Sequence, residues 1–376
     1  MAVIYFDESP FFISHIFHRQ YLTLKPISVD MVDASHVIYP YRPSHAAAII
    51  LSIAVAASLS LHIYQGLKYR SKGLAYFMMW GGSVFTTGWV LRAISTYTPS
   101  NLNLYIAQYV FIYAGPPIYS AAEYTVLGRL LRYLPMHAPL NPDRVRYAFI
   151  YLGAVVEGLT GAGASLMATS KDDASQKQSG SVLISIALLL QAVIELGFIA
   201  MIAITHRRCV LAGTFPRNVR RLCIMLYGTS ALVLARCVFR AIESFATLSA
   251  LSSCNNLCHA VLLQEWYLYI FEALPMLIYT GWINVMYPGA LLPRDRNVYL
   301  DSDGLTERVG PGWIDKRSQW QTFADPFDLV GTIKGQQKHG RFWLEPDKWV
   351  ITREVEDQHD PALLAADLSH RAYNNK

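Results

Sequence analysis

Seven long apolar stretches, separated by short polar segments, dominate the first 290 residues of the chain. Each is close to the roughly 20 residues that a helix needs to cross a bilayer. The predicted spans are His45–Gln65, Leu74–Ser95, Leu102–Tyr124, Tyr147–Ala168, Val182–Thr205, Leu222–Ile242 and Trp266–Tyr287. This pattern predicts an all-α, polytopic membrane protein built as a seven-helix transmembrane bundle.

The two ends of the chain lack this pattern. Residues 1–43 hold no apolar run long enough for a span, and Pro40 and Pro43 stand before the first predicted helix. Residues 290–376 are charged and interrupted by Pro and Gly. They carry only scattered aromatic residues, such as Trp313, Trp320, Phe342, Trp343 and Trp349. We therefore expect an N-terminal tail (1–43), a transmembrane domain (44–289) and a largely disordered C-terminal tail (290–376).

Basic residues alternate between the predicted loops. They are Lys68, Arg70 and Lys72 in the first loop, Arg129, Arg132, Arg144 and Arg146 in the third, Arg207, Arg208, Arg217, Arg220 and Arg221 in the fifth, and Arg294 and Arg296 after the last span. The second and sixth loops have no Lys or Arg, and two lysines in the fourth are matched by two aspartates. Since cytoplasmic loops carry the excess of Lys and Arg, we expect the N-terminus outside and the C-terminus in the cytoplasm.

Composition agrees with a membrane protein. Of 376 residues, 53% are hydrophobic and 16% are charged, which is too apolar for an ordinary soluble enzyme of this size. The net charge of +5 is explained by membrane topology, so we expect no nucleic-acid partner. Five cysteines give no disulfide scaffold. Cys254 and Cys258 lie in a predicted outer loop, and their spacing leaves a local disulfide open.

The sixth span carries charged residues on one face. Arg236, Arg240 and Glu243 are spaced i, i+4 and i+7, so their side chains project from the same side of the helix. A charge at the centre of a membrane helix costs roughly 2.5–3.5 kcal/mol and therefore needs a partner, a water-filled cavity or an interface. The face is either a structural ion-pair network or the polar part of a site, and the two roles are compatible.

Depth in the membrane follows from the helical rise of 1.5 Å per residue. Arg236 lies about 21 Å from the cytoplasmic end of its span, and Glu272 lies about 9 Å below the outer end of the seventh. The sequence therefore predicts an outer-leaflet polar cluster in which Arg236 pairs with Glu272. Its members are Arg92, Arg236, Arg240, Glu243 and Glu272. Glu157 and Glu195 are predicted to lie deeper, on other helices, and leave proton coupling open.

The third span contains Gly115, Pro116 and Pro117 near mid-membrane. We expect a kink there, because the two proline nitrogens cannot donate hydrogen bonds and their rings crowd the preceding turn. A kink beside small residues either opens a cavity or permits close helix packing.

Several motifs resemble one family in combination. The third span, QYVFIYAGPPIYSAAEYTVLGRLL, matches it through Gln108, Pro116, Ala121, Ala122, Tyr124, Gly128 and Arg129. ARCVFRAIE in the sixth matches through Arg236, Phe239, Arg240 and Glu243, Gln191 fits in the fifth, and the seventh span and its end match through Glu265, Tyr269, Pro288 and Gly289. Over roughly residues 40–293 the chain resembles the fungal lipid-translocating exporter family, the RTA-like seven-span membrane proteins.

The chain departs from the family pattern at several positions. Phe85 stands where the family usually has an acidic residue, Gly153 and Thr160 stand where it has Asp and Gln, and Tyr287 replaces a His before Pro-Gly. Glu272 replaces an Asp, which is a conservative change. The chain therefore resembles a divergent member.

The resemblance implies export or transport of amphipathic lipids such as sphingoid long-chain bases, or resistance to toxic sterol-like compounds. It places such proteins in the plasma membrane or in internal fungal membranes. A cationic amphiphile would suit carboxylates such as Glu243 and Glu272. The sequence has no GxxxxGK[ST] motif, so we expect no ATP hydrolysis by this chain and no cofactor. It leaves the oligomeric state open.

Two other functions are compatible with parts of the sequence pattern. A seven-span receptor or sensor of lipid or membrane stress has the same topology and would act through its cytoplasmic loops and tail, although the seventh span has no Lys for a retinal Schiff base. An intramembrane hydrolase ranks third, because the spans contain only His45 and His62 as histidine ligands and there is no Gly-X-Ser-X-Gly elbow. We therefore expect no enzyme.

Overall fold

Helices make up most of the described part of the expected membrane domain. In this computed structural model they are α2 (His45–Tyr69), α3 (Lys72–Tyr97), α4 (Leu102–Tyr133), α5 (Pro142–Thr169), α6 (Ala174–Leu211), α7 (Arg217–Ala250), the π-helix η1 (Leu268–Ala273), α9 (Leu274–Val285) and α10 (Pro288–Leu291). The structure describes residues 39, 41–169, 174–250, 263–313 and 342–354, together with positions 321, 325 and 333. Cys254 and Cys258 lie outside these residues.

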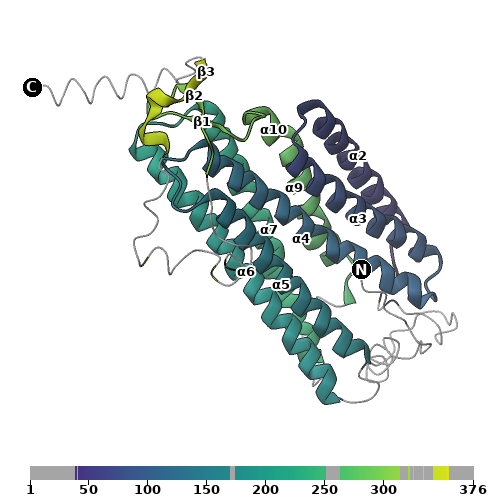
Figure 1. Cartoon of the computed structure of the whole chain (residues 1–376). Coiled ribbons are helices and arrows are strands. Elements are labelled where there is room, and N and C mark those ends of the chain that lie inside the picture. Colours follow the sequence, from purple (N-terminus) through teal and green to yellow (C-terminus); the bar gives the residue numbers. More distant parts are fainter. Residues whose placement is uncertain are drawn as a thin grey trace, which may run out of the picture.

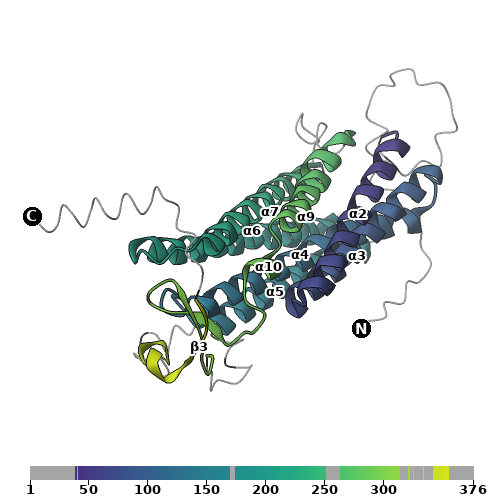
Figure 2. The same ribbon diagram turned by 90° about the horizontal axis from the view of Figure 1, so that it is seen from above.

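The helices form a bundle in which neighbours in the chain are neighbours in space (Figures 1 and 2). Each helix from α2 to α7 packs on the next, α7 packs on η1 and α9, and α9 returns to α2, so the arrangement closes on itself. The buried interior includes Phe85, Trp89, Tyr119, Phe198 and Met276, which come from α3, α4, α6 and α9.

The bundle has two chemically different ends. We call the end with the α2–α3, α4–α5 and α6–α7 turns the basic end. There, His137 of the α4–α5 turn forms a hydrogen bond with Thr214 of the α6–α7 turn, with 2.6 Å between Nε2 and Oγ1. Burial and nearby Arg208 lower the pKa of His137. The opposite end carries the start of α2, where the Ser44 hydroxyl accepts the Ala47 N–H, and the α3–α4 turn, where Asn101 accepts the Leu104 N–H.

Helix α4 is continuous through Pro116 and Pro117, and it lies against α3 at glycines. A Cβ atom on Gly115 would come within 2.7 Å of the Phe85 Cβ, and one on Gly88 within 2.6 Å of the Ile112 nitrogen. Small residues let two backbones approach this closely. Close packing is therefore the outcome seen beside the two prolines, while the kink itself stays a prediction.

The seventh predicted span begins with a widened helical turn. In η1 the N–H of Leu274 donates to the carbonyl of Tyr269, five residues back. Pro275 follows at the start of α9, where its ring crowds the preceding turn and its nitrogen cannot donate, so a locally wider helix relieves the conflict. Glu272 lies on this turn and is buried.

Five of the described helices are long and apolar enough to cross a membrane. They are His45–Tyr69, Pro142–Met167, Ser175–Leu211, Arg217–Leu248 and Leu268–Leu291. Large apolar side chains such as Ile53, Val193 and Val285 remain exposed on the outside of the bundle, as expected of helices surrounded by lipid. The chain is thus an α-helical integral membrane protein. The expected spans in α3 and α4 do not reach the same apolar character.

Part of the C-terminal segment forms a small antiparallel sheet at the basic end (Figure 1). Its strands, in the order β1-β2-β3, are β1 (Val298–Leu300), β2 (Thr306–Val309) and β3 (Val350–Glu354). Tyr133 at the end of α4 donates a hydrogen bond to the Glu307 carboxylate, at 2.9 Å, and attaches the sheet to the bundle.

The expectation of a largely disordered tail over residues 290–376 is therefore wrong for the described strands. Asp301 and Arg308 form an ion pair across the first hairpin, with 2.6 Å between Oδ2 and Nε. Phe342 packs edge-on against Tyr299, and it also contacts Trp343. Scattered aromatic residues thus give this segment a small core of its own, which the search for a regular apolar period missed.

Candidate intramembrane charge cluster

A buried ion pair joins Arg236 on α7 to Glu272 on η1. The Nη2 and Nε atoms of Arg236 lie 2.7 and 2.8 Å from the same carboxylate oxygen, Oε1. Only 4% of the arginine side chain and none of the glutamate side chain is exposed. The sequence-derived pairing is therefore present. Two charges this deeply buried depend on each other, because either one alone would be left in an apolar interior without compensation.

The next turn of α7 carries a more accessible pair. Arg240 forms an ion pair with Glu243, and its guanidinium carbon lies 3.7 Å from the ring centroid of Tyr113 on α4. The two charged side chains are 15% and 23% exposed. Carboxylate, guanidinium and aromatic ring therefore meet where a molecule from outside the bundle can reach them.

Arg92 was expected from the sequence to lie in the same polar layer as the Arg236 site, with no partner named. This fully buried guanidinium on α3 forms an ion pair with Glu265, with 2.7 Å between Nη2 and Oε1, and it makes no ion pair with Glu243 or Glu272. Glu265 also accepts the backbone N–H of Ser44 at 2.8 Å. The ion pair of Arg92 is therefore separate from that of Arg236, while its place in a common polar layer stays a prediction. Glu265, which entered the sequence analysis only through a motif match, joins three elements at the opposite end.

A row of tyrosines connects the Arg92 site with the Arg240 site. Tyr105, Tyr109 and Tyr113 are four residues apart on α4, and successive ring centroids lie 5.1 and 5.5 Å apart. Arg92 lies 5.9 Å from the Tyr109 ring, whereas Arg240 covers Tyr113. The four-residue spacing is a signal that sequence reasoning had available and did not use.

Two further tyrosines come from the segment before α2. Tyr41 accepts a hydrogen bond from Arg92 Nη2 at 3.1 Å, and Tyr39 accepts one from the buried amide of Gln108 at 2.8 Å. Burial raises the pKa of Tyr39, and burial with the neighbouring Tyr109 hydroxyl raises that of Tyr41 well above its usual value. Both phenols therefore stay neutral at physiological pH, and the end of the N-terminal segment is part of this site.

Glu157 was expected to lie deeper in the membrane than the charged residues of α7, but it lies near two of them. Its carboxylate on α5 interacts electrostatically with both Arg236 and Arg240. Its side chain is exposed. Helical rise gives the position of a residue along an axis but not the direction in which its face points, which is why the sequence separated Glu157 from these arginines.

A second buried acidic site lies between α4 and α6. Glu123 and Glu195 interact electrostatically, and both are almost completely buried. Neither oxygen of Glu123 has a hydrogen-bond partner within the described residues. Glu195 was expected from the sequence as an intramembrane carboxyl group and Glu123 was not, although a carboxyl group inside an apolar span is itself a signal.

The remaining motif residues have mainly structural surroundings. Tyr124 is buried between Phe149 and Phe198, with ring centroids 5.2 Å away in each case. Arg129 donates to the carbonyl of Pro293. Gln191 is partly buried on α6 and has no hydrogen bond to a described side chain. No three His, Cys, Asp or Glu side chains of the described segments gather as metal ligands do.

We call Arg236, Glu272, Arg240, Glu243 and Glu157 the charge cluster. The charge cluster combines two properties. Glu157, Arg240 and Glu243 present charge at accessible positions, while the surrounding helices expose apolar side chains. Such a surface is suited to a molecule with a charged head and an apolar body, because each part meets a matching environment.

Comparison with known proteins gives one family. The family described as RTA1 like protein matches residues 78–295, which include the whole of this cluster. A lipid-translocating exporter-like protein RTA1 from Leptosphaeria maculans is 37% identical over 307 residues, covering 77% of this chain and 59% of that protein. The chain therefore spans well under two thirds of that relative's length.

Two other relatives are more distant. A lipid-translocating exporter-like protein RTA1 from Ajellomyces capsulatus is 30% identical over 278 residues, covering 70% of this chain and 81% of the relative. Protoporphyrin uptake protein 1 from Saccharomyces cerevisiae is 25% identical over 291 residues, covering 66% of this chain and 91% of that protein. No solved structure matches the chain.

We expect Glu272→Gln to lower the free energy of unfolding by about 3–5 kcal/mol, because Arg236 would stay buried without a counter-charge. Glu195→Gln is the matched control, since it makes the same chemical change at a buried carboxyl group that forms no ion pair among the described residues. We expect it to cost less than about 1.5 kcal/mol. Unfolding of the purified variants in detergent micelles measures both values, and equal losses would contradict the role of the pair.

Proposed function

The chain belongs to the RTA1-like family, and from that membership we propose that it moves amphipathic lipids across a membrane. Relatives named as lipid-translocating exporter-like proteins support this cargo class. Another relative is named for uptake, so the proposal covers movement in either direction.

The observation that carries the proposal is the accessible part of the charge cluster. Arg240, Glu243 and the exposed Glu157 form a polar surface within helices whose outer faces are apolar. A lipid that crosses a bilayer has to bring its headgroup through an apolar region, and fixed charges along the way lower the cost of doing so.

A cationic amphiphile such as a sphingoid long-chain base fits this surface best. Its ammonium group can pair with Glu157, which forms no ion pair among the described residues, or it can displace Arg240 from Glu243. Glu272, expected from the sequence to serve the same purpose, is buried and occupied by Arg236, so its proposed role is to hold the bundle together. Sterol-like toxic compounds are the second cargo class and would use the apolar surface more than the charges.

The proposed topology has seven spans. Helices α3 and α4 have 26 and 32 residues, long enough to cross a bilayer, and they occupy places in the closed bundle between helices that are apolar enough to span. We propose an outer N-terminal tail (1–43), a membrane domain (44–289) and a cytoplasmic C-terminal segment (290–376). The basic end then faces the cytoplasm, as the distribution of Lys and Arg favours. The proposed location is the plasma membrane.

We expect purified protein reconstituted in liposomes to accelerate transbilayer movement of a fluorescent sphingoid long-chain base. Glu157→Gln and Glu243→Gln should each slow the protein-dependent rate by about tenfold, the effect of losing one charge-assisted contact. The matched control is Glu345→Gln, which removes an exposed carboxylate from the C-terminal segment and should leave the rate unchanged.

Two results would contradict these proposals separately. Absence of any protein-dependent movement, with the protein folded and inserted, would contradict transport and favour a receptor or sensor. Undiminished lipid movement in both glutamine variants would be compatible with transport. It would contradict the proposal that the lipid headgroup passes along the charge cluster.

The topology can be tested with single cysteines in a variant whose five native cysteines are replaced. In intact cells, a membrane-impermeant maleimide should label Ser100→Cys in the α3–α4 turn, whereas Ala212→Cys in the α6–α7 turn should react only after permeabilisation. The reverse pattern would overturn the orientation, and labelling of both from outside would overturn the number of spans between them.

A further inference from the structure

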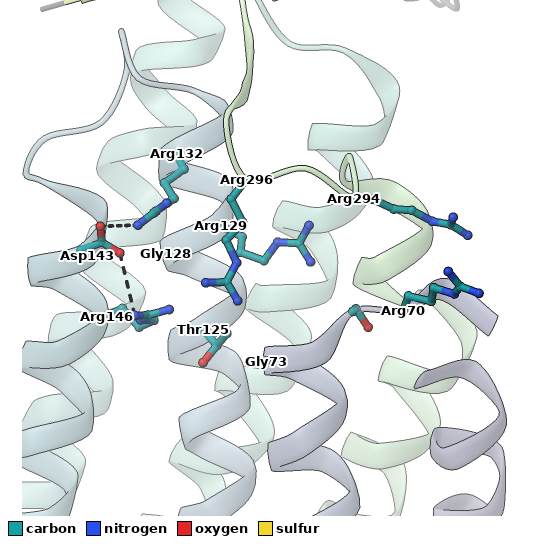
Figure 3. A pocket seen from close by; sticks show the side chains of 11 residues that line it. Arg70, Gly73, Thr125, Gly128, Arg129, Arg132, Asp143, Arg146, Arg294 and Arg296 are labelled. Atoms are coloured by element: carbon teal, nitrogen blue, oxygen red, sulfur yellow. Dashed lines mark hydrogen bonds and ion pairs between the residues drawn. The ribbon is translucent and has the colours of Figure 1, made fainter. Parts of the chain in front are cut away.

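A pocket of about 180 Å³ opens at the basic end (Figure 3), and none of its lining residues belongs to the charge cluster. It lies between the α2–α3 turn, the last turns of α4, the first turns of α5 and the segment after α10. On the same measure a single water needs only about 10–15 Å³, so the pocket has room for a polyatomic ligand. Six arginines line it: Arg70, Arg129, Arg132, Arg146, Arg294 and Arg296.

The charges in the pocket are strongly unbalanced. Among the described residues, Asp143 is the one carboxylate that lines it, and this residue already pairs with Arg132 and lies 3.9 Å from Arg146 (Figure 3). Within the part of the chain that the structure describes, the other four arginines form no ion pair. Asp295, which lies in an adjoining recess, accepts the backbone N–H of Asn297 instead.

One buried hydrogen-bond donor at the pocket is unused. Nε of Arg146 is buried and has no hydrogen-bond partner among the described residues. In Figure 3, Arg129, Arg146 and Arg296 approach the same space from three different elements. Guanidinium groups crowded in this way repel one another, and their planar donors match the oxygens of a phosphate group.

The start of α3 adds to this positive environment. Ser71 precedes α3 but does not cap it with its side chain, because its hydroxyl is engaged with Tyr287 at 2.8 Å. Ser71 therefore leaves the first N–H groups of α3 without a side-chain cap of its own. Gly73 lies in this turn, where a Cβ would come within 3.3 Å of Thr125 and 3.9 Å of Arg296, so glycine keeps the space beside the arginines open.

We propose that this pocket binds a phosphate dianion, either as the phosphomonoester of a lipid headgroup or as free phosphate. A lipid is the source that the surroundings favour. Leu67 is 72% exposed three residues before Arg70, and Tyr76 and Tyr147 are exposed close to the pocket's α3 and α5 sides. Helix ends lie at headgroup level, so acyl chains could follow these apolar side chains while the phosphate occupies the pocket. Binding of phosphate in this pocket is independent of the proposed transport function.

The test uses the full-length protein in phosphate-free detergent, with thermal unfolding as the readout. Dioctanoyl phosphatidic acid should raise the unfolding temperature saturably, whereas dioctanoyl phosphatidylcholine should not. Arg296→Gln should weaken the apparent affinity about tenfold, since one charge-assisted contact is lost. Arg296 is exposed and forms no ion pair among the described residues, so this variant should fold; Arg146→Gln is the second variant.

The matched control is Arg207→Gln, which removes an exposed arginine at the same end of the bundle but outside the pocket. It should bind as the unmodified protein does. A shift by inorganic phosphate alone, equal to that by phosphatidic acid and lost in Arg296→Gln, would support the pocket with free phosphate as its ligand. No shift with either probe, or equal losses in Arg207→Gln and Arg296→Gln, would overturn the proposal.

Discussion

The ion pair between Arg236 and Glu272 is the constraint on which the arrangement of the bundle depends. Both side chains lie in an apolar interior, where neither charge is tolerated without the other. The pair joins α7 to the widened turn η1, and that turn exists because Pro275 disturbs the helix that follows. A local backbone irregularity therefore places a carboxylate opposite the arginine that needs it.

The remaining polar groups are arranged around this pair. Arg240 and Glu243 continue the same face of α7 toward accessible space, and the tyrosines of α4 extend from there to Arg92 and Glu265. The pocket at the basic end has a different balance, because six arginines line it and Asp143 is the one carboxylate among its described lining residues. One end of the bundle thus neutralises its charges internally, while the other leaves positive charge for an external anion. A lipid-handling membrane protein can use both environments, one for cargo and one for an anionic partner.

The sequence predicted those features that depend on local periodicity. Runs of about 20 apolar residues gave the helices, and their rise gave the depth at which Arg236 meets Glu272. Contacts that depend on the direction in which a helix face points were not predicted. The interaction of Glu157 with Arg236 and Arg240 is one example. Glu265 was overlooked as the partner of Arg92 because it stands just before a predicted span, where depth cannot be counted along a helix. The sheet at the basic end escaped prediction because its strands have three to five residues and β3 lies some forty residues beyond β2.

A double-mutant cycle on Arg236 and Glu272 tests the central claim most directly. The free energy of unfolding would be measured for Arg236→Met, Glu272→Met and the double variant. The buried pair predicts that each single variant loses about 3–5 kcal/mol and that the double variant is more stable than either, because no charge is then left alone. Losses that simply add in the double variant would contradict the view that this pair holds the bundle together.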